Sequence, residues 1–247
     1  MTSSSSHKES DPTYVVVFAH PDDESMFFLP TIRWLVDHQQ AVWFLSLTNG
    51  NYDGLGSVRE SELKKAGQLL GASKVIVRND NTILDHPKKR YDKTTVANAI
   101  RDSLSKHASK DQTFVLITFD ELGVSGHVNH IDVYHGVVHL MENNANSIQL
   151  KEAWYLESER NMLAKYVPVV SWMLLLLALL TSTFQSTTTD SSTTKTFRMH
   201  EPVLNWKAMA THRSQFVWYR RLFVVFSSYT YYNKLKCIPS KPQKKID

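Results

Sequence analysis

The sequence has a single cysteine and no acceptor site for N-glycosylation. Cys237 is the only cysteine among 247 residues, so the chain cannot form an internal disulfide. No Asn-x-Ser/Thr triplet occurs anywhere, and such triplets mark glycosylated surface loops of secreted proteins. Both absences favour a reducing, cytosol-facing compartment.

Long hydrophobic runs and a strong charge imbalance are also missing. The most apolar stretch, Val167 to Leu180, is shorter than the roughly 20 residues that span a bilayer, which favours a core or interfacial helix. Residues 1–12 are polar and Ser-rich, without the apolar centre of a secretory signal, and we expect a disordered tail there. The net charge of +4 is too mild to indicate a nucleic-acid partner.

What is present suits one sizeable domain. Hydrophobic residues make up 42% of the chain and charged residues 21%, enough for a real core. We expect a single domain over residues 13–235. Within it, 161–200 is expected to be an insertion, made of the apolar helix and a Ser/Thr-rich loop. Residues 206–235 are expected to form a basic-aromatic helix, and 236–247 a basic tail.

Short apolar runs alternate with segments of helical pattern. This alternation implies right-handed crossovers and an α/β fold, a doubly wound and mostly parallel Rossmann-like sheet with a helical, partly irregular C-terminal extension. In the common order 3-2-1-4-5, strands one and four are neighbours. The predicted strands are 14–18, 41–47, 74–78, 113–119 and 152–156. The predicted helices are 26–40, 57–70 (with Ser57 and Glu60 as a capping box and Gly71 as its stop), 94–107 and 131–142.

The stretch Ala19-His20-Pro21-Asp22-Asp23-Glu24 follows the first strand directly. Its acids therefore lie at the carboxyl end of a strand, the edge where open α/β sheets bind ligands. One imidazole and two carboxylates can supply two metal ligands and leave one oxygen base beside the metal. The alternative is a turn followed by an acidic helix N-terminus.

A second motif, Gly126-His127-Val128-Asn129-His130, follows the fourth strand. Its two histidines are three residues apart, so on a first helical turn they lie on nearly one face. Because strands one and four are expected to be neighbours, the two motifs would face each other across the crevice between them. His86, His107, His135 and His139 lack such a partner motif and are expected on the surface or in packing.

The two motifs together resemble the PIG-L/LmbE family of zinc-dependent de-N-acetylases. The resemblance covers about Tyr14 to Tyr232 and is closest to the eukaryotic branch, which acts on N-acetylglucosaminyl-phosphatidylinositol. It implies an LmbE-like fold and a hydrolase for the second step of GPI-anchor biosynthesis, with a glycolipid substrate, at the cytoplasmic face of the endoplasmic reticulum membrane. The resemblance also runs through Arg59-Glu60-Ser61-Glu62-Leu63, Phe119-Asp120, Gly123-Val124-Ser125 and His212-Arg213-Ser214-Gln215.

The resemblance also assigns roles to the motif residues. It implies that His20, Asp23 and His130 bind Zn²⁺, although the same set could hold another divalent ion. Asp22 is then the general base that takes a proton from water. A protonated His127 would stabilise the tetrahedral oxyanion.

Substrate contacts are expected from Arg59, Asn49 and Asp120. Arg59 suits bidentate phosphate recognition, with Glu62 one turn on to hold its guanidinium. Asn49 lies in a polar, Gly-bearing loop expected to cover the substrate. Asn129 stands where bacterial relatives often have Asp, so Asp120 is the candidate carboxylate beside His127.

Two other functions remain open on sequence grounds. One is a soluble deacetylase of another N-acetylglucosaminide, and the other is a catalytically silent scaffold with the same fold. The aromatic and basic residues of Trp206 to Tyr232 favour the glycolipid substrate, since such side chains suit a bilayer interface. The same stretch could instead pack onto the sheet.

Overall fold

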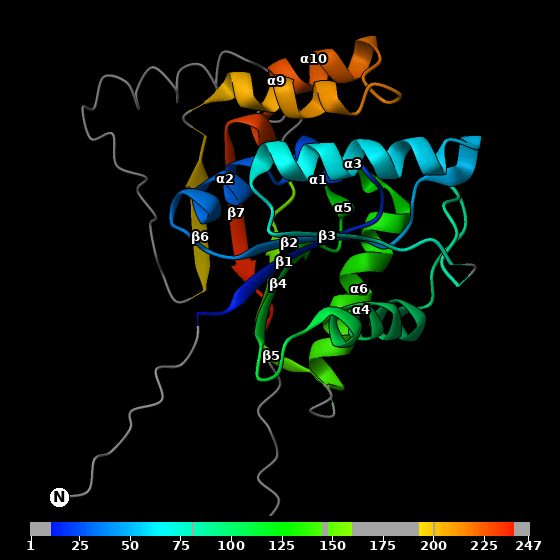
Figure 1. Ribbon diagram of the computed structural model, residues 1–247, viewed down its shortest axis with the longest axis vertical. Helices are drawn as coiled ribbons and strands as arrows, with labels where there is room; N and C mark the ends of the chain where they lie inside the picture. The colour runs from blue at the N-terminus through cyan, green and yellow to red at the C-terminus, as the bar shows by residue number, and fades with distance from the viewer. Residues whose placement is uncertain (1–10, 81, 145–147, 160–192, 200, 240–247) are drawn as a thin grey trace, which may run out of the picture.

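The protein is seen in a computed structural model that describes residues 11–239 apart from 81, 145–147, 160–192 and 200. A seven-stranded sheet in the order β3-β2-β1-β4-β5-β7-β6 runs through its centre, with helices on both faces (Figure 1). Five strands are parallel: β1 (Thr13–Phe18), β2 (Val42–Ser46), β3 (Lys74–Val77), β4 (Thr113–Phe119) and β5 (Gln149–Leu156). The predicted α/β fold, with its strand order 3-2-1-4-5, is therefore confirmed.

The central strands β1, β2 and β4 are buried on both faces because they are apolar almost throughout. Alternate residues of a strand point to opposite faces, and in β1 Val15 and Val17 join one core cluster while Val16 and Phe18 join another. The first cluster includes residues of α4 (Lys93–His107) and α6 (Val128–Glu142). The second includes residues of α2 (Leu29–Asp37) and α3 (Gly56–Leu70). Figure 1 shows these two helix layers on opposite sides of the sheet.

The helix predicted over 26–40 is two helices, α1 (Asp23–Phe27) and α2. The break falls at Phe28, whose ψ of 1° is not helical. Pro30 lies in the first turn of α2, where its missing N–H costs no intrahelical hydrogen bond. The acidic motif therefore opens α1 instead of preceding the helix as a loop.

The predicted capping box at the start of α3 is wrong. The N-cap is Leu55, and no side chain caps it. Instead Asn51, in the short 3₁₀ helix η1 (Asn51–Asp53), accepts a hydrogen bond from Gly56 N–H at 2.8 Å. The predicted stop is confirmed, since Gly71 ends α3 with a φ of 80° that favours glycine.

The single basic-aromatic helix predicted over 206–235 is also wrong. The segment contains α9 (Pro202–Thr211), α10 (Trp218–Phe226), the 3₁₀ helix η2 (Ser228–Thr230) and β7 (Tyr232–Cys237). β7 pairs antiparallel with β5, and β6 (Thr194–Arg198) pairs antiparallel with β7. Strands β7 and β6 thus extend the sheet beyond β5. After Ser227, strand pairing overrides the helical pattern of the sequence.

The predicted N-terminal tail and most of the 161–200 insertion lie outside the described residues. Among the helices that the structure describes, none combines the length and apolar character required to cross a bilayer.

Helices α4 and α6 pack closely at Gly136. A Cβ on this residue would lie 2.1 Å from Cγ1 of Val96, so Gly136→Ala should force the two helices apart. We expect the variant to lose about 1–3 kcal/mol of unfolding free energy in urea denaturation. Val96→Ala combined with Gly136→Ala should recover part of that loss through their coupling. Purely additive losses would contradict this packing.

Candidate active site

A cavity of about 590 Å³ lies at the carboxyl ends of β1 and β4. These strands are direct neighbours, with Val16 opposite Ile117, so the segments that follow them meet. The two motifs, more than a hundred residues apart in sequence, therefore line one cavity. Its polar lining includes His20, Asp22, Asp23, Arg59, Asp85, His127, His130 and Arg220, and its apolar lining includes Met26, Phe27, Leu222, Phe223 and Phe226.

The three predicted metal ligands lie together, with His20 and His130 beside the carboxylate of Asp23. Its Oδ1 lies 3.2 Å from Nε2 of His130, and its Oδ2 lies 3.7 Å from Nδ1 of His20. Backbone N–H groups of Ala19 and His20 donate to Oδ2 at 3.2 and 2.9 Å. Burial opposes the charged form, but the imidazoles of His130 and His20 keep the pKa of Asp23 below its usual range.

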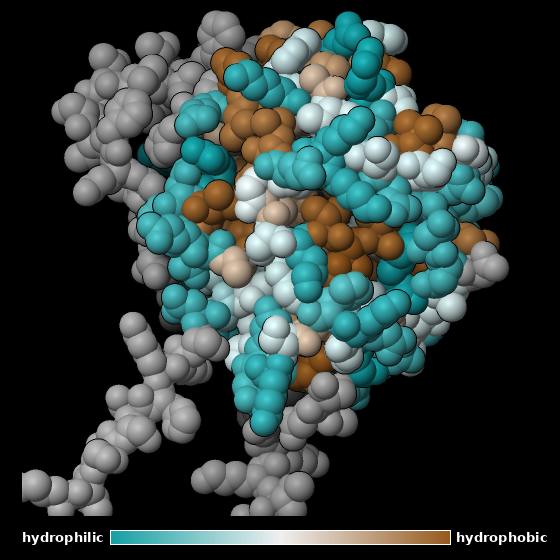
Figure 2. Space-filling model, in the orientation of Figure 1, coloured by the Kyte–Doolittle hydropathy of each residue, from teal (hydrophilic) through white to brown (hydrophobic). Residues whose placement is uncertain are grey.

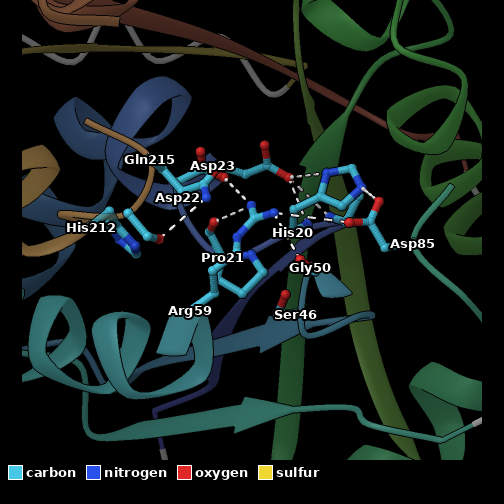
Figure 3. A network of polar contacts seen from close by, with 12 residues as sticks. His20, Pro21, Asp22, Asp23, Ser46, Gly50, Arg59, Asp85, His212 and Gln215 are labelled. Atoms are coloured by element: carbon cyan, nitrogen blue, oxygen red, sulfur yellow. Dashed lines mark hydrogen bonds and ion pairs between the residues drawn. The ribbon is translucent and has the colours of Figure 1, made fainter. Parts of the chain in front are cut away.

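In both imidazoles the ring nitrogen that points away from Asp23 has an acceptor, and such a contact fixes the ring orientation of metal-binding histidines. His130 Nδ1 donates to the carbonyl of Gly123 at 3.0 Å, so Nε2 is the ring nitrogen directed at Asp23. His20 Nε2 lies 3.1 Å from Oδ1 of Asp85, which can accept a hydrogen bond from it and leaves Nδ1 on the Asp23 side (Figure 3). The side-chain amide of Asn129 lies 3.1 Å from His20 Nε2, so only the backbone of Asn129 contacts the ring of His127.

His127 stands beside these two imidazoles, and ligand nitrogens of the three lie within 4.8 Å of one another. Its Nδ1 accepts the N–H of Asn129 at 3.3 Å, so a neutral ring carries its proton on Nε2. Burial, together with the neighbouring His130 and His20, lowers its pKa to about 4. The prediction of a protonated His127 is therefore corrected: near neutral pH this imidazole is an uncharged donor.

Asp22 is held in a strained conformation by two guanidinium groups. Its φ of 118° is rare for a residue with a side chain, and such strain costs about 1–3 kcal/mol. Arg59 Nη2 donates to Oδ1 at 3.1 Å, and Arg220, from α10, donates to Oδ2. Burial raises the pKa of Asp22, and the two arginines oppose that rise.

Glu24 ties this motif to the C-terminal part of the chain. It is fully buried, and its Oε1 lies 2.6 Å from Nε2 of His212, also fully buried, directly after α9. Its Oε2 accepts the backbone N–H of Asp22 at 3.1 Å, which steadies the strained residue. The Glu24 carboxylate holds the pKa of His212 above its usual value, although burial alone would lower it.

Other predicted residues have different partners from those expected. Glu62 accepts hydrogen bonds from N–H and Oγ of Ser214, at 2.8 and 2.6 Å, and does not hold Arg59. Asp120 accepts from Ser158 N–H at 2.7 Å and Oγ at 2.6 Å, so it orders the loop after β4 and is not the carboxylate beside His127. Arg59 lines the cavity, whereas Asn49 and Asp120 do not line it.

Sequence reasoning missed four residues of the site. Glu24 lies in the first motif and His212 in a segment of family resemblance. Both were therefore in view, but nothing in the sequence assigned either a role. Asp85 lies in the irregular polar connection after β3, and Arg220 in a stretch of aromatic and basic residues. Neither position is marked by a pattern.

Comparison with known proteins agrees with this geometry. The model of the PIG-L family, described as GlcNAc-PI de-N-acetylase, matches residues 15–141. A probable N-acetylglucosaminyl-phosphatidylinositol de-N-acetylase of Schizosaccharomyces pombe is 34% identical over 95% of this chain and 90% of its own length. The Bos taurus de-N-acetylase of the same name is 32% identical over 90% of this chain and 81% of its own length. The chain belongs to the PIG-L family. The predicted family is thereby confirmed.

Solved structures show that the PIG-L chain has the fold of bacterial and archaeal deacetylases. N,N'-diacetylchitobiose deacetylase from Pyrococcus horikoshii matches with a TM-score of 0.58 at 16% identity, over 95% of this chain and 88% of its own. The zinc-inhibited form of teicoplanin deacetylase Orf2 matches with a TM-score of 0.56 at 12% identity, over 94% of this chain and all of its own. At these identities the likeness extends to the fold alone.

The side chains of this PIG-L family site fit a divalent metal ion. Imidazole nitrogens and a carboxylate oxygen converge in one buried place, and the histidines have acceptors on their far sides. These donors suit zinc and also iron, manganese or nickel. These residues therefore form a candidate metal site, and the donor set does not specify its ion.

The Glu24–His212 pair should be important for stability. His212→Ala would leave a fully buried carboxylate without its cationic partner, which typically costs about 3–5 kcal/mol. We expect that loss in the free energy of unfolding, measured in urea. Glu24→Gln together with His212→Ala should cost less than the sum of the single changes. A loss within error of zero for His212→Ala would show that the pair carries no stability.

Proposed function

We propose that this chain removes the N-acetyl group from N-acetylglucosaminyl-phosphatidylinositol, the amide hydrolysis of the second step of GPI-anchor biosynthesis. One observation carries the proposal beyond family membership. The cavity that holds the carboxylates and imidazoles is also lined by large apolar side chains, among them Phe27, Leu222 and Phe223, as a sugar joined to a lipid requires.

His20, Asp23 and His130 would hold the metal ion, which we propose to be zinc. Their ring nitrogens and carboxylate face one another, whereas the Asn129 N–H on Nδ1 of His127 leaves a proton on its Nε2. When bound there, such an ion supplies a Lewis acid that activates water near neutral pH.

Asp22 would act as the general base. It lies next in sequence to Asp23, lines the cavity, and has a raised pKa from burial, which makes it a better proton acceptor. Asp22 takes the proton of the attacking water, the oxygen adds to the acetyl carbonyl, and Asp22 later returns the proton to the departing amine. His127 donates its Nε2–H to the oxyanion that forms in between. The products are acetate and the free glucosamine.

Arg59 and Arg220 bring positive charge to the same cavity. Arg59 already donates to Asp22 and to the carbonyls of Pro21 and Gly50, and its buried Nε has no partner among the described residues. We propose that these two arginines attract the phosphodiester of the substrate. The substrate contacts predicted for Asn49 and Asp120 stay predictions.

A lipid-borne substrate places the enzyme at a membrane surface. We propose the cytoplasmic face of the endoplasmic reticulum membrane, which accords with the family's role in GPI-anchor biosynthesis and with the cysteine-poor composition.

The function is tested by incubating the purified full chain with N-acetylglucosaminyl-phosphatidylinositol and measuring acetate and free amine. Release that a chelator abolishes and added zinc restores is the expected result. Asp22→Asn should bind the same amount of zinc but turn over about 100-fold to 10,000-fold more slowly. Near-native turnover by Asp22→Asn would remove Asp22 as the base. No release by the native chain loaded with metal would overturn the proposed function.

Metal content tests the ligand set independently of activity. His130→Ala should lower the zinc bound per chain, because it removes an imidazole whose Nε2 faces Asp23. His135→Ala is the matched control, since His135 is exposed on the same helix. Elemental analysis after dialysis gives the stoichiometry. An unchanged zinc content in His130→Ala would remove this residue from the ligands.

A further inference from the structure

Helix α10 carries large apolar side chains on an outer face. Trp218 is 71% exposed, Tyr219 55% and Leu222 48%, the first of these the most exposed large apolar side chain in the described part of the chain. Together with Arg221 they form the outer face of α10. Figure 2 shows apolar residues among hydrophilic ones at the end of the molecule where Figure 1 places α9 and α10.

This outer face is distinct from the face that holds α10 in place. Trp218 and Leu222 are four residues apart and share one side of the helix. Arg220 and Val224 share the opposite side, where Arg220 donates to Asp22 and Val224 is buried. The outer residues are therefore not required to attach the helix to the fold.

The surroundings of the outer face are positively charged. From Pro202 to Ile246 the chain contains no Asp or Glu. Lys207, Arg213 and Arg221 are exposed within α9, α10 and the segment between them. Exposed aromatic side chains beside basic ones, in a segment without acids, match the headgroup region of a bilayer that contains anionic lipid. The exposed acid that shares the cavity lining with them is Asp53, from η1.

The outer face is also continuous with the cavity. Tyr219 and Leu222 are exposed and at the same time line the cavity, next to Phe223. A surface that met Trp218 and Leu222 would therefore lie beside residues that line the cavity. A lipid could pass from that surface to the cavity without its apolar part crossing water.

We propose that the outer face of α10 docks on a bilayer rich in anionic phospholipid and opens the cavity to it. The proposal rests on the proposed function in one respect: a lipid-borne substrate is what makes docking on a lipid surface useful to this chain. The docking itself is a property of Trp218, Tyr219, Leu222 and Arg221.

Vesicle binding by the full chain tests the docking. The probe is co-sedimentation with vesicles of phosphatidylcholine alone or with phosphatidylserine. The native chain should bind the anionic vesicles more tightly, and added salt should weaken that binding. Trp218→Ser should weaken it about tenfold, because an aromatic anchor is lost. Arg221→Glu should weaken it about 30-fold, because the charge changes by two units.

Matched controls lie on α3. Leu69→Ser removes an apolar side chain that is 43% exposed, and Lys65→Glu reverses an exposed charge. Both should bind vesicles like the native chain. Acetate release from a substrate analogue without acyl chains should be the same in Trp218→Ser as in the native chain, while release from vesicle-embedded substrate should fall.

The outcomes separate docking from activity. Native-like vesicle binding by both α10 variants, or equal losses in the α3 controls, would overturn the docking site. Absence of vesicle binding by the native chain would overturn it too and would favour a protein partner for this face. Vesicle binding that depends on Trp218 and Arg221, with no acetate release from any substrate, would support the docking and overturn the proposed function.

Discussion

Three consecutive carboxylates are buried directly after β1, and the rest of the site follows from the need to neutralise them. Asp22, Asp23 and Glu24 are at most 4% exposed, and an unpaired buried charge costs several kcal/mol. Each therefore takes a cationic or ionisable partner from a different part of the chain. His130 after β4 faces Asp23, Arg59 of α3 and Arg220 of α10 face Asp22, and His212 after α9 faces Glu24. One short acidic segment thus joins the parallel half of the sheet to the C-terminal elements.

Much of this arrangement could be predicted because it depends on adjacency along the chain and on strand order. The runs that became β1 and β4 are apolar on both faces, as buried parallel strands are, and their neighbourhood in a doubly wound sheet brings His20 and His130 together. The identity of the partners was harder. The sequence around a carboxylate such as Glu62 or Asp120 is the same whether its partner is an arginine or a serine. Only the packing of remote loops determines which partner it has. Asp85 and Ser214 show this, since both contacts cross from one loop to another element.

The segment from Trp206 onward was predicted less well because its structure also depends on remote contacts. Its residues from Trp206 onward are aromatic and β-branched enough to suit either a helix or a strand. The edge of β5 decides between them, because its unpaired backbone groups bind β7. Asn233, in β7, then reaches α2, where its Oδ1 accepts from Oγ1 of Thr31 at 2.8 Å. Such a contact spans some two hundred residues, and no local pattern could reveal it.

The position of α10 gives the proposed docking a chemical consequence. The same helix turns Trp218 outward and Arg220 inward to Asp22, and the preceding helix α9 ends at His212, which pairs with Glu24 of the acidic segment. A bilayer that held the outer face would hold the cation on the proposed base as well. An incoming phosphodiester competes with Asp22 for Arg220, since a guanidinium binds either anion. Under the proposed function, release of that arginine by the phosphodiester would make Asp22 a better proton acceptor, and the contact that neutralises the buried acid would then favour phosphorylated glycolipids over free sugars.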